Sequence, residues 1–440
     1  MKPASCTFTT IFFSLCVAFA PLPAGAAGAA AMDHVSWSRS ANIYEVNIRQ
    51  YTQEGTIKAF AAHLPRLKKM GVDIIWIMPV QPIGVQERKG TLGSYYAVRD
   101  YTAVNPEFGN LDDFKNMVKQ AHALGMHVIL DWVANHTAWD HPWATGHSDW
   151  FLKNEKGEIY PVTYTEGGQT EHWSDVIGLD YSNKALWKGM TDAMAFWVRA
   201  ADIDGFRCDV AGRVPTPFWN QARDELNKIK PMFMLAEADK PEHHEHAFDM
   251  SYGWDSLAVF KNVAKGTADA RDLRQLVTNP PKAFPRDAYR MRFTNNHDVD
   301  SWDGSDTELY GPAFKAMAVL AATLPGMPLI YGGQEAGLSK KLEFFEKDPI
   351  QWKTYEYSGF YAKLLKLKKR NPALWNGQYG GGVEVLDTAN DKVFAYKRQM
   401  GTNVVKVVVN VSGEKQSYTL PGAKPAPLAA WDYKIDAPKK

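Results

Sequence analysis

The sequence predicts an α/β fold, a (β/α)8 TIM barrel with a small insert after its third strand and a C-terminal β-sandwich. Three observations favour this fold. Apolar runs alternate with segments of helical periodicity, four of these runs lead into carboxylates or imidazoles, and 440 residues suffice for one barrel with a small appendage. Successive βα units with buried apolar strands indicate a parallel sheet.

The first 26 residues have the layout of a secretory signal. Lys2 precedes an apolar run over residues 8–20, and the small residues Ala24 to Ala26 follow. The run is short for a membrane span, which needs about 20 residues. We therefore expect an exported protein, periplasmic or secreted, that is cleaved near Ala26 and has no membrane span in its mature chain.

Signal removal would take away two of the three cysteines, Cys6 and Cys16. A lipid-attachment role for Cys16 is disfavoured because Leu15 before it is not a small residue. Only Cys208 would remain, so we expect no internal disulfide in the mature protein. By strand parity Cys208 faces away from Asp209, which predicts a packed and unreactive thiol.

The mature chain begins with alternating helices and strands. Residues 57–67 place apolar side chains at helical spacing, and residues 72–78 form a buried strand. Asn110 can cap a second helix, with acidic residues in its first turn. A third helix, with apolar positions over 186–197, precedes the strand that leads to Asp209.

The strand that ends at Asp209 carries the first candidate site. Side chains alternate along a strand, so Arg207 and Asp209 share one side. A fixed positive charge beside a carboxylate lowers the pKa of that carboxylate and keeps it ionised, as a nucleophile at neutral pH must be. The same two residues are also compatible with a structural ion pair at a strand end.

Three further segments favour the catalytic interpretation. Apolar runs that begin at Val128, Phe233 and Phe293 lead into polar groups, namely Asp131, Asn135, His136, Glu237, His297 and Asp298. In a (β/α)8 barrel the carboxyl ends of the strands converge on one face, where the active site is built. The four segments together therefore predict one shared site.

These blocks resemble the signature regions of a known family. Residues 131–136, 205–211, 237 and 296–298 resemble, in order and roughly in spacing, the four signature regions of the α-amylase family, glycoside hydrolase family 13. Two flanking segments agree, since residues 93–101 resemble the stretch with the sugar-stacking tyrosine and residues 326–335 resemble the eighth-strand motif. The resemblance covers nearly all of the chain after the signal.

The resemblance implies retaining glycoside hydrolysis. A carboxylate attacks the anomeric carbon, while a carboxylic acid about 5 to 5.5 Å away protonates the leaving oxygen and then activates water. Asp209 fits the nucleophile. Glu237 fits the acid/base, because neighbouring carboxylates and its apolar strand would raise its pKa. Asp298 would bind sugar hydroxyls and favour the distorted transition state.

The same resemblance supplies the sugar-binding candidates. His136 and His297 would contact the sugar before the cleavage point, Tyr96 would stack beneath that sugar, and Arg207 would accompany the nucleophile. Each histidine could alternatively be a structural imidazole.

Asn135 corresponds to a calcium-binding asparagine of many α-amylases. The other ligands would come from the insert and cannot be assigned from the sequence, so a structural calcium stays open. We expect no cofactor for the chemistry itself. The run Glu242–His246 lacks the His-Glu-x-x-His spacing of a metal site and is interpreted as a solvated loop.

Two stretches interrupt the βα alternation. The insert, residues 137–182, shows no clear helix and holds four tryptophans that either stack on sugar or pack the insert's own core, Trp139, Trp143, Trp150 and Trp173. The barrel is expected over residues 27–371, and the C-terminal domain over 372–440, where strands follow one another from residue 383 to 420.

Charge and composition narrow the class of partner. The formal net charge is +1, with 50 basic and 49 acidic residues, which gives no electrostatic case for nucleic acid or an anionic membrane. Aromatic residues make up 12% and include 15 Trp, and their flat rings suit the faces of sugars as well as a protein core. The expected partner is a neutral α-glucan, and the oligomeric state stays open.

The predicted function is α-amylase-like, endo-acting hydrolysis of α-1,4 bonds in starch-derived glucans and maltooligosaccharides. The block Val176–Asp180 matches none of the patterns that separate 1,4-acting from 1,6-acting members, so the linkage stays open. An exo-acting α-glucosidase or an α-glucan transglycosylase on the same scaffold is the alternative. A non-catalytic glycan-binding or transporter-associated relative is the alternative from another class, and the presence of all three acids disfavours it.

Overall fold

The computed structural model describes residues 32–166, 169–352 and 354–438. The predicted signal segment, with Cys6 and Cys16, lies outside these ranges, so export stays a prediction. No helix in the described ranges is both long enough and apolar enough to cross a membrane.

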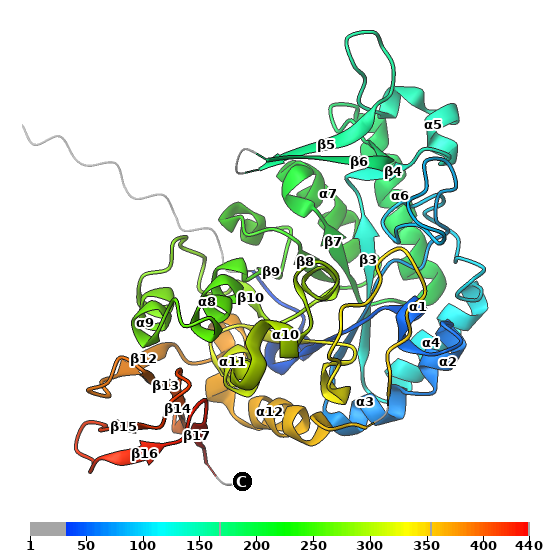
Figure 1. Cartoon of the computed structure of the whole chain (residues 1–440). Coiled ribbons are helices and arrows are strands. Elements are labelled where there is room, and N and C mark those ends of the chain that lie inside the picture. The colour runs from blue at the N-terminus through cyan, green and yellow to red at the C-terminus, as the bar shows by residue number, and fades with distance from the viewer. Residues whose placement is uncertain (1–31, 167–168, 353, 439–440) are drawn as a thin grey trace, which may run out of the picture. The chain divides into compact units, whose positions relative to one another are not determined.

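Eight parallel strands close into a barrel, in the order β1-β11-β10-β9-β8-β7-β3-β2 around the ring. They are β1 (Ile43–Val46), β2 (Ile74–Ile77), β3 (His127–Val133), β7 (Gly205–Asp209), β8 (Phe233–Ala236), β9 (Met250–Tyr252), β10 (Tyr289–Arg292) and β11 (Met327–Tyr331). Figure 1 shows the strands surrounded by helices. The predicted (β/α)8 barrel is confirmed.

Twelve α-helices lie in the described ranges. They are α1 (Ile48–Tyr51), α2 (Ile57–Ala61), α3 (Leu64–Met70), α4 (Leu111–Ala123), α5 (Pro142–Gly146), α6 (Lys184–Ala201), α7 (Thr216–Asn227), α8 (Trp254–Ala264), α9 (Ala270–Thr278), α10 (Asp306–Tyr310), α11 (Phe314–Thr323) and α12 (Ser358–Arg370). The expected cap of α4 is confirmed, since the Asn110 side chain accepts from the Asp113 N–H and the Asp113 side chain accepts in return.

The first predicted helix is wrong in one respect. The spacing over residues 57–67 predicts one helix, whereas α2 ends at Ala61 and α3 begins at Leu64. Pro65 lies in the first turn of α3, where its missing N–H is tolerated. Within a continuous helix the same proline would remove a hydrogen bond and clash with the preceding turn. The apolar spacing therefore continues although the helix itself is interrupted between Ala61 and Leu64.

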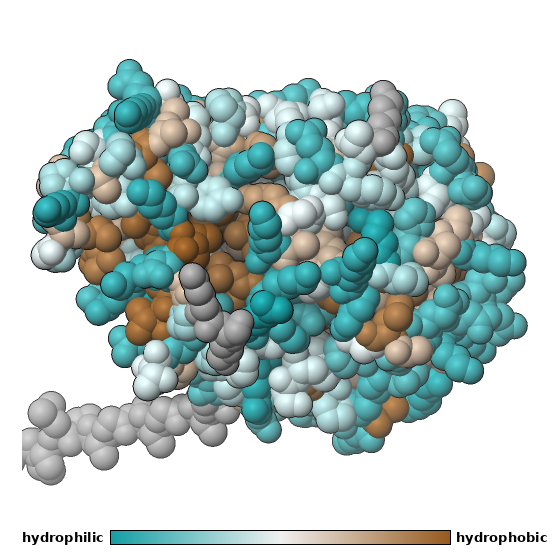
Figure 2. All heavy atoms as spheres, turned by 90° about the horizontal axis from the view of Figure 1, so that it is seen from below, coloured by the Kyte–Doolittle hydropathy of each residue, from teal (hydrophilic) through white to brown (hydrophobic). Residues whose placement is uncertain are grey.

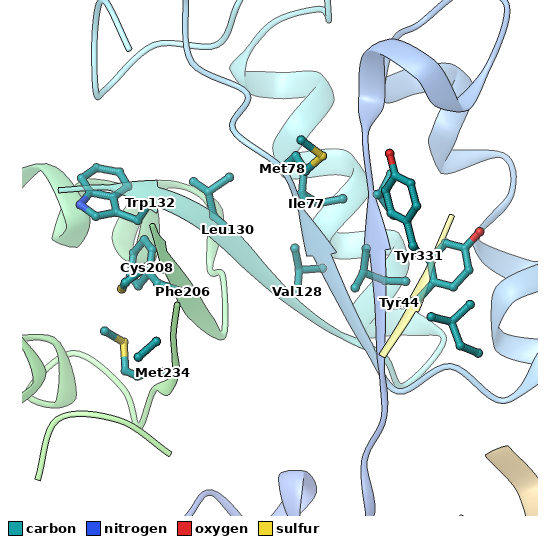
Figure 3. Close-up of a cluster of buried hydrophobic side chains, with 14 of the residues drawn as sticks. Tyr44, Ile77, Met78, Val128, Leu130, Trp132, Phe206, Cys208, Met234 and Tyr331 are labelled. Carbon is teal, nitrogen blue, oxygen red and sulfur yellow. The ribbon is translucent and has the colours of Figure 1, made fainter. Parts of the chain in front are cut away.

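The outward faces of the barrel strands form an apolar layer beneath the helices. Figure 3 shows part of this layer, including Tyr44, Val128, Leu130, Trp132, Phe206, Cys208 and Met234. Cys208 is fully buried there, and burial raises the pKa of its thiol well above the ordinary value. Its side chain therefore lies on the opposite face of β7 from Asp209, as strand parity predicts.

Strands β7 and β8 approach each other closely at Gly205. A Cβ atom placed on Gly205 would lie 1.9 Å from the backbone oxygen of Phe233, far inside van der Waals contact. Only glycine fits at this position without moving one of the two strands.

The insert contains a small antiparallel sheet in the order β4-β6-β5, made of β4 (His136–Ala138), β5 (Pro161–Glu166) and β6 (Gln169–Gly178). Figure 1 shows the β5–β6 hairpin beyond the carboxyl ends of β3 and β7. We expected no clear helix in the insert, but the single turn α5 lies within it. That turn is too short to show helical periodicity in the sequence.

The C-terminal region is a sandwich of two antiparallel sheets, as predicted. A four-stranded sheet contains β12 (Val383–Leu386), β13 (Val393–Met400), β14 (Asn403–Asn410) and β17 (Tyr433–Asp436), and a two-stranded sheet contains β15 (Gln416–Tyr418) and β16 (Ala426–Leu428). Its buried residues include Val393, Val408, Tyr418 and Leu428. Figure 2 views the protein from below and shows a mostly polar surface with smaller apolar areas. The domain boundaries given above stay predictions.

Candidate active site

The arginine of β7 lies at the centre of a group of carboxylates. Arg207 Nη1 lies 2.9 Å from Asp131 Oδ1 and 2.9 Å from Asp209 Oδ1, and Nη2 lies 2.9 Å from Glu237 Oε1. The Arg207 side chain is fully buried, whereas Asp209 and Glu237 reach the cleft above it. Strand parity and the parallel register of β3, β7 and β8 bring these groups to one end of the barrel.

Arg207 lowers the pKa of Asp209 as expected, but the expectation that this pKa lies below its ordinary value is wrong. Burial and then the Glu237 carboxylate raise the pKa of Asp209 well above its ordinary value, and Arg207 only opposes them. One guanidinium is divided among three carboxylates, so it cannot offset their burial. Burial also raises the pKa of Glu237, as expected, with Arg207 opposing and Asp298 adding to the rise. The carboxyl pair therefore retains a proton to higher pH than an isolated acid.

Glu237 is oriented by backbone that follows β7. The Val210 N–H donates to Glu237 Oε2 over 2.7 Å, and the Glu237 N–H donates to the Cys208 carbonyl over 3.0 Å. Val210 has φ +40°, in the left-handed region that a β-branched residue rarely adopts. Such strain is typical of functional sites, and here it accompanies an N–H that holds the acid.

Asp298 lies in the loop after β10 and not at the end of a strand. The run from Phe293 was expected to be a strand, but β10 ends at Arg292. The side chains of the next residues bond to the loop, since Asn295 Nδ2 donates to the Gly304 carbonyl and Asn296 Oδ1 accepts from the Val299 N–H. These bonds replace the sheet ladder and turn the chain, so that Asp298 reaches the cleft.

His297 lies between Asp298 and Glu45, a residue of β1. Its Nδ1 lies 2.5 Å from Glu45 Oε1, its Nε2 lies 2.7 Å from the Tyr96 hydroxyl, and Asp298 Oδ2 is 3.3 Å from Nε2. Burial opposes the charged imidazole, but Asp298 and Glu45 raise the pKa of His297 to about 9. A doubly protonated ring can donate through both nitrogens at neutral pH.

Sequence reasoning missed the residues beneath the site. Glu45 was not singled out, and Asp131 appeared in a signature block without a role. The Asp131 carboxylate accepts from Trp76 Nε1 over 3.0 Å and from the Tyr96 hydroxyl over 3.1 Å. The available signal was a carboxylate inside each of two buried strands, because a buried acid needs partners. The identity of those partners had no local signal.

The remaining sugar-binding candidates lie in the same cleft. Its volume is about 1330 Å³, and it is lined by all the candidates except Arg207 and Asn135, namely Tyr96, His136, Asp209, Glu237, His297 and Asp298. His136 is buried, and burial lowers its pKa to about 4, so its imidazole is neutral at pH 7. Trp173 is the member of the insert's four tryptophans that lines the cleft, while Trp143 and Trp150 pack edge to face at 5.0 Å.

The two segments considered for metal binding, Asn135 and the run Glu242–His246, do not form a clear metal site in the described residues. Asn135 Nδ2 lies 3.1 Å from His136 Nδ1, and the described residues contain no group of three or more His, Cys, Asp or Glu placed to hold a metal. A calcium at Asn135 would therefore have at most two carboxylates among its ligands, and it stays a prediction. The run Glu242–His246 is not simply a solvated loop, because His243 and His244 are buried and His244 Nε2 lies 2.7 Å from Ser251 Oγ.

The fold has a match among known protein families. Residues 33–385 match the family described as Alpha amylase, catalytic domain. The chain belongs to the α-amylase family. This confirms the resemblance seen in the signature blocks.

Relatives within the α-amylase family include both hydrolases and transferases by name. The α-amylase MalA of Haloarcula japonica is 27% identical over 93% of this chain and 61% of its own length. The α-1,4-glucan:maltose-1-phosphate maltosyltransferase of Rhodospirillum rubrum is 29% identical over 84% of this chain and 56% of its own length. The chain thus spans about three fifths of the length of these curated relatives.

A solved structure of the α-amylase family matches over the whole fold. The crystal structure of an α-amylase from Lactobacillus plantarum superposes with a TM-score of 0.81 at 29% identity, covering 92% of this chain and 100% of that one.

Proposed function

We propose that this protein is a retaining, endo-acting glycoside hydrolase that cleaves α-1,4 bonds in starch-derived glucans and maltooligosaccharides. The observation that carries the proposal is the arrangement of Asp209 and Glu237 over one buried arginine, Arg207, at the floor of the cleft. Burial raises the pKa of both residues, and the Glu237 carboxylate raises that of Asp209 further, which favours one proton shared by the pair; retaining hydrolysis requires one acid and one carboxylate.

In the proposed first step, Asp209 Oδ attacks the anomeric carbon and Glu237 gives its proton to the departing glycosidic oxygen. The bond between Asp209 and the sugar forms as the bond to the leaving sugar breaks, which leaves Glu237 ionised. In the second step Glu237 takes a proton from water, the hydroxyl adds to the anomeric carbon, and the Asp209 carboxylate departs.

The neighbouring residues would bind and distort the sugar. Asp298 is 36% exposed at its side chain and would accept from sugar hydroxyls, while His297 lines the cleft beside it. Tyr96 would lie beneath the sugar and neutral His136 beside it. The Val210 N–H that holds Glu237 favours the ionised acid, so it supports the base role in the second step.

One of the alternatives, a transglycosylase, has support of its own. A transglycosylase would use the same covalent step with a sugar hydroxyl in place of water, and the maltosyltransferase name of a relative favours it. An exo-acting α-glucosidase would need one closed end of the cleft. A non-catalytic glycan-binding protein is disfavoured, because sugar binding alone requires neither the strained backbone at Val210 nor buried acids with raised pKa values.

Product analysis on maltoheptaose, starch and isomaltose tests the proposal. We expect a range of short maltooligosaccharides from the first two, no cleavage of isomaltose, and products released first as the α-anomer. Glucose as the sole early product would favour the exo-acting alternative. Oligosaccharides longer than the substrate would favour transglycosylation, and no cleavage of any α-glucan would contradict the proposal.

A further inference from the structure

An exposed tryptophan stands at the rim of the cleft and has no part in the chemistry above. Among the described residues, four large hydrophobic side chains are exposed, Val85, Leu152, Trp302 and Tyr355. Trp302 is 55% exposed and is the member of this set that lines the cleft. A single exposed apolar residue is normal on a protein surface, but Trp302 packs against other aromatic rings of the cleft.

Trp302 is the outermost member of a row of rings that begins at His297, beside the three acids. The Trp302 and Phe344 rings lie 5.3 Å apart, and Phe344 stacks on Tyr96 at 6.3 Å with 12° between their planes. Tyr96 in turn stacks on His297 at 5.4 Å. All four side chains line the cleft, so the row forms one continuous wall from His297 to the rim.

The backbone holds Trp302 in its exposed position. It lies in a π-helix, Val299–Asp303, a form that occurs often at functional sites. Buried Asp300 accepts from the Leu342 N–H over 2.9 Å, and Lys341 Nζ donates to the Trp302 carbonyl over 2.8 Å. These bonds join the loop after β10 to the loop after β11. The indole is therefore presented without a loop having to order when a ligand binds.

The position of the row in the barrel indicates which end of the substrate it faces. Trp302 and Phe344 follow β10 and β11, whereas Glu237 follows β8, and β11 lies across the ring from β7. Glu237 would protonate the leaving sugar. Tyr96 would lie beneath the sugar on the other side of the cleaved bond. A row that continues outward from Tyr96 and Phe344 thus leads away from the leaving group.

We propose that Trp302, backed by Phe344, is a platform for a glucose unit on the non-reducing side, beyond the unit over Tyr96. The apolar face of a glucose ring stacks on a flat indole. This inference rests on the proposed function and deepens it. The substrate class it selects is a linear α-glucan long enough to reach from the acids to the rim, and it makes Trp302 a specificity-determining residue.

The test compares substrates of different length in Trp302→Ala and Trp302→Phe proteins. Trp302→Ala should lower kcat/KM for maltoheptaose about five- to ten-fold, mainly through KM, since one stacking contact is lost. An aryl α-glucoside, with a single sugar before the cleaved bond, should be hydrolysed as by the wild type. Trp302→Phe should restore most of the loss. Tyr355→Ala is the matched control, because Tyr355 is an exposed aromatic residue outside the cleft.

A binding measurement separates this inference from the proposed function. Titrating maltoheptaose into Asp209→Asn protein should change the tryptophan fluorescence, and Trp302→Phe in that background should remove most of the change. Equal losses on long and short substrates, or an unchanged KM in Trp302→Ala, would overturn the platform. If the wild type cleaves no α-glucan but maltoheptaose still binds through Trp302, the proposed function fails and the platform stands.

Discussion

Arg207 Nη1 lies 2.9 Å from Asp209 Oδ1, and both side chains project from the same face of β7. The same nitrogen is equally close to Asp131, so the nucleophile candidate shares its positive partner. The ionisation of Asp209 is therefore decided by the whole group of acids. Replacing any member should change the protonation of the others.

Asp209→Asn removes the attacking charge and should lower kcat on maltoheptaose by about three orders of magnitude or more. The amide is nearly isosteric, so circular dichroism and maltoheptaose binding should change little. Asp192→Asn, at a carboxylate 61% exposed on α6, is the control and should keep normal turnover. Near-normal kcat in Asp209→Asn would show that another group is the nucleophile.

Glu237→Gln should slow natural glucans severely but slow aryl α-glucosides much less in the glycosylation step, because good leaving groups depart with little protonation. Added azide should then partly restore turnover and give an α-glycosyl azide, since azide attacks without base help. The measurement is single-turnover kinetics with product identification. Equal losses on both substrates, without an azide product, would point to Asp298 as the next acid to test.

The raised pKa of His297 predicts a loss of stability at alkaline pH. Its folded pKa of about 9 exceeds the unfolded value near 6.5, so its contribution is complete below pH 6.5 and is lost as the pH rises through 9. The whole contribution is at most about 3 kcal/mol. Urea unfolding between pH 6 and 9.5 should show a smaller alkaline decline in His297→Asn than in the wild type. A matched decline in both proteins would mean that His297 does not titrate in this range.

Asp249 should behave in the opposite sense. Burial opposes its ionisation, but Arg223 and His34 lower the pKa of Asp249 to about 2. Its stabilisation is complete above the unfolded pKa near 4 and is lost as the pH falls towards 2. Asp249→Asn leaves the buried Arg223 unpaired and should reduce the free energy of unfolding by about 3 to 5 kcal/mol. Urea titration at pH 7 measures the loss, and a change under 1 kcal/mol would contradict the role given to this ion pair.

Export is tested by expressing residues 1–440 with the predicted signal segment included. Mature protein beginning close to Ala27 should occur in the periplasm or medium. Leu15→Arg places a charge in the apolar run of the signal and should keep the precursor inside the cell. N-terminal sequencing that finds Met1 retained in a membrane fraction would refute the prediction.

The parts of the site that depend on local pattern were predictable. Alternation along one strand placed Arg207 and Asp209 together, and a single cap residue, Asn110, marked the start of α4. The barrel itself followed from apolar runs that lead into polar groups. Such signals lie within a few residues of each other, so the sequence contains them in full.

The parts that depend on distant contacts were not predictable. Glu45 and His297 are 252 positions apart, and nothing near either residue indicates the other. Strand β9, Met250–Tyr252, is too short to show a period of two. The shift in the pKa of Asp209 was predicted in the wrong direction, because burial and then the distant Glu237 carboxylate raise this pKa more than Arg207, in the same strand, lowers it.

The close approach of β7 and β8 at Gly205 limits which amino-acid replacements this position can tolerate. Asp209 ends β7 and Glu237 directly follows β8, and the separation of these strands depends on the hydrogen atom that Gly205 carries in place of a side chain. A substitution there would push the nucleophile and the acid apart without altering either. Position 205 should therefore tolerate as few amino-acid replacements as positions 209 and 237, and a survey of viable variants would count it among the catalytic positions although it never contacts the sugar.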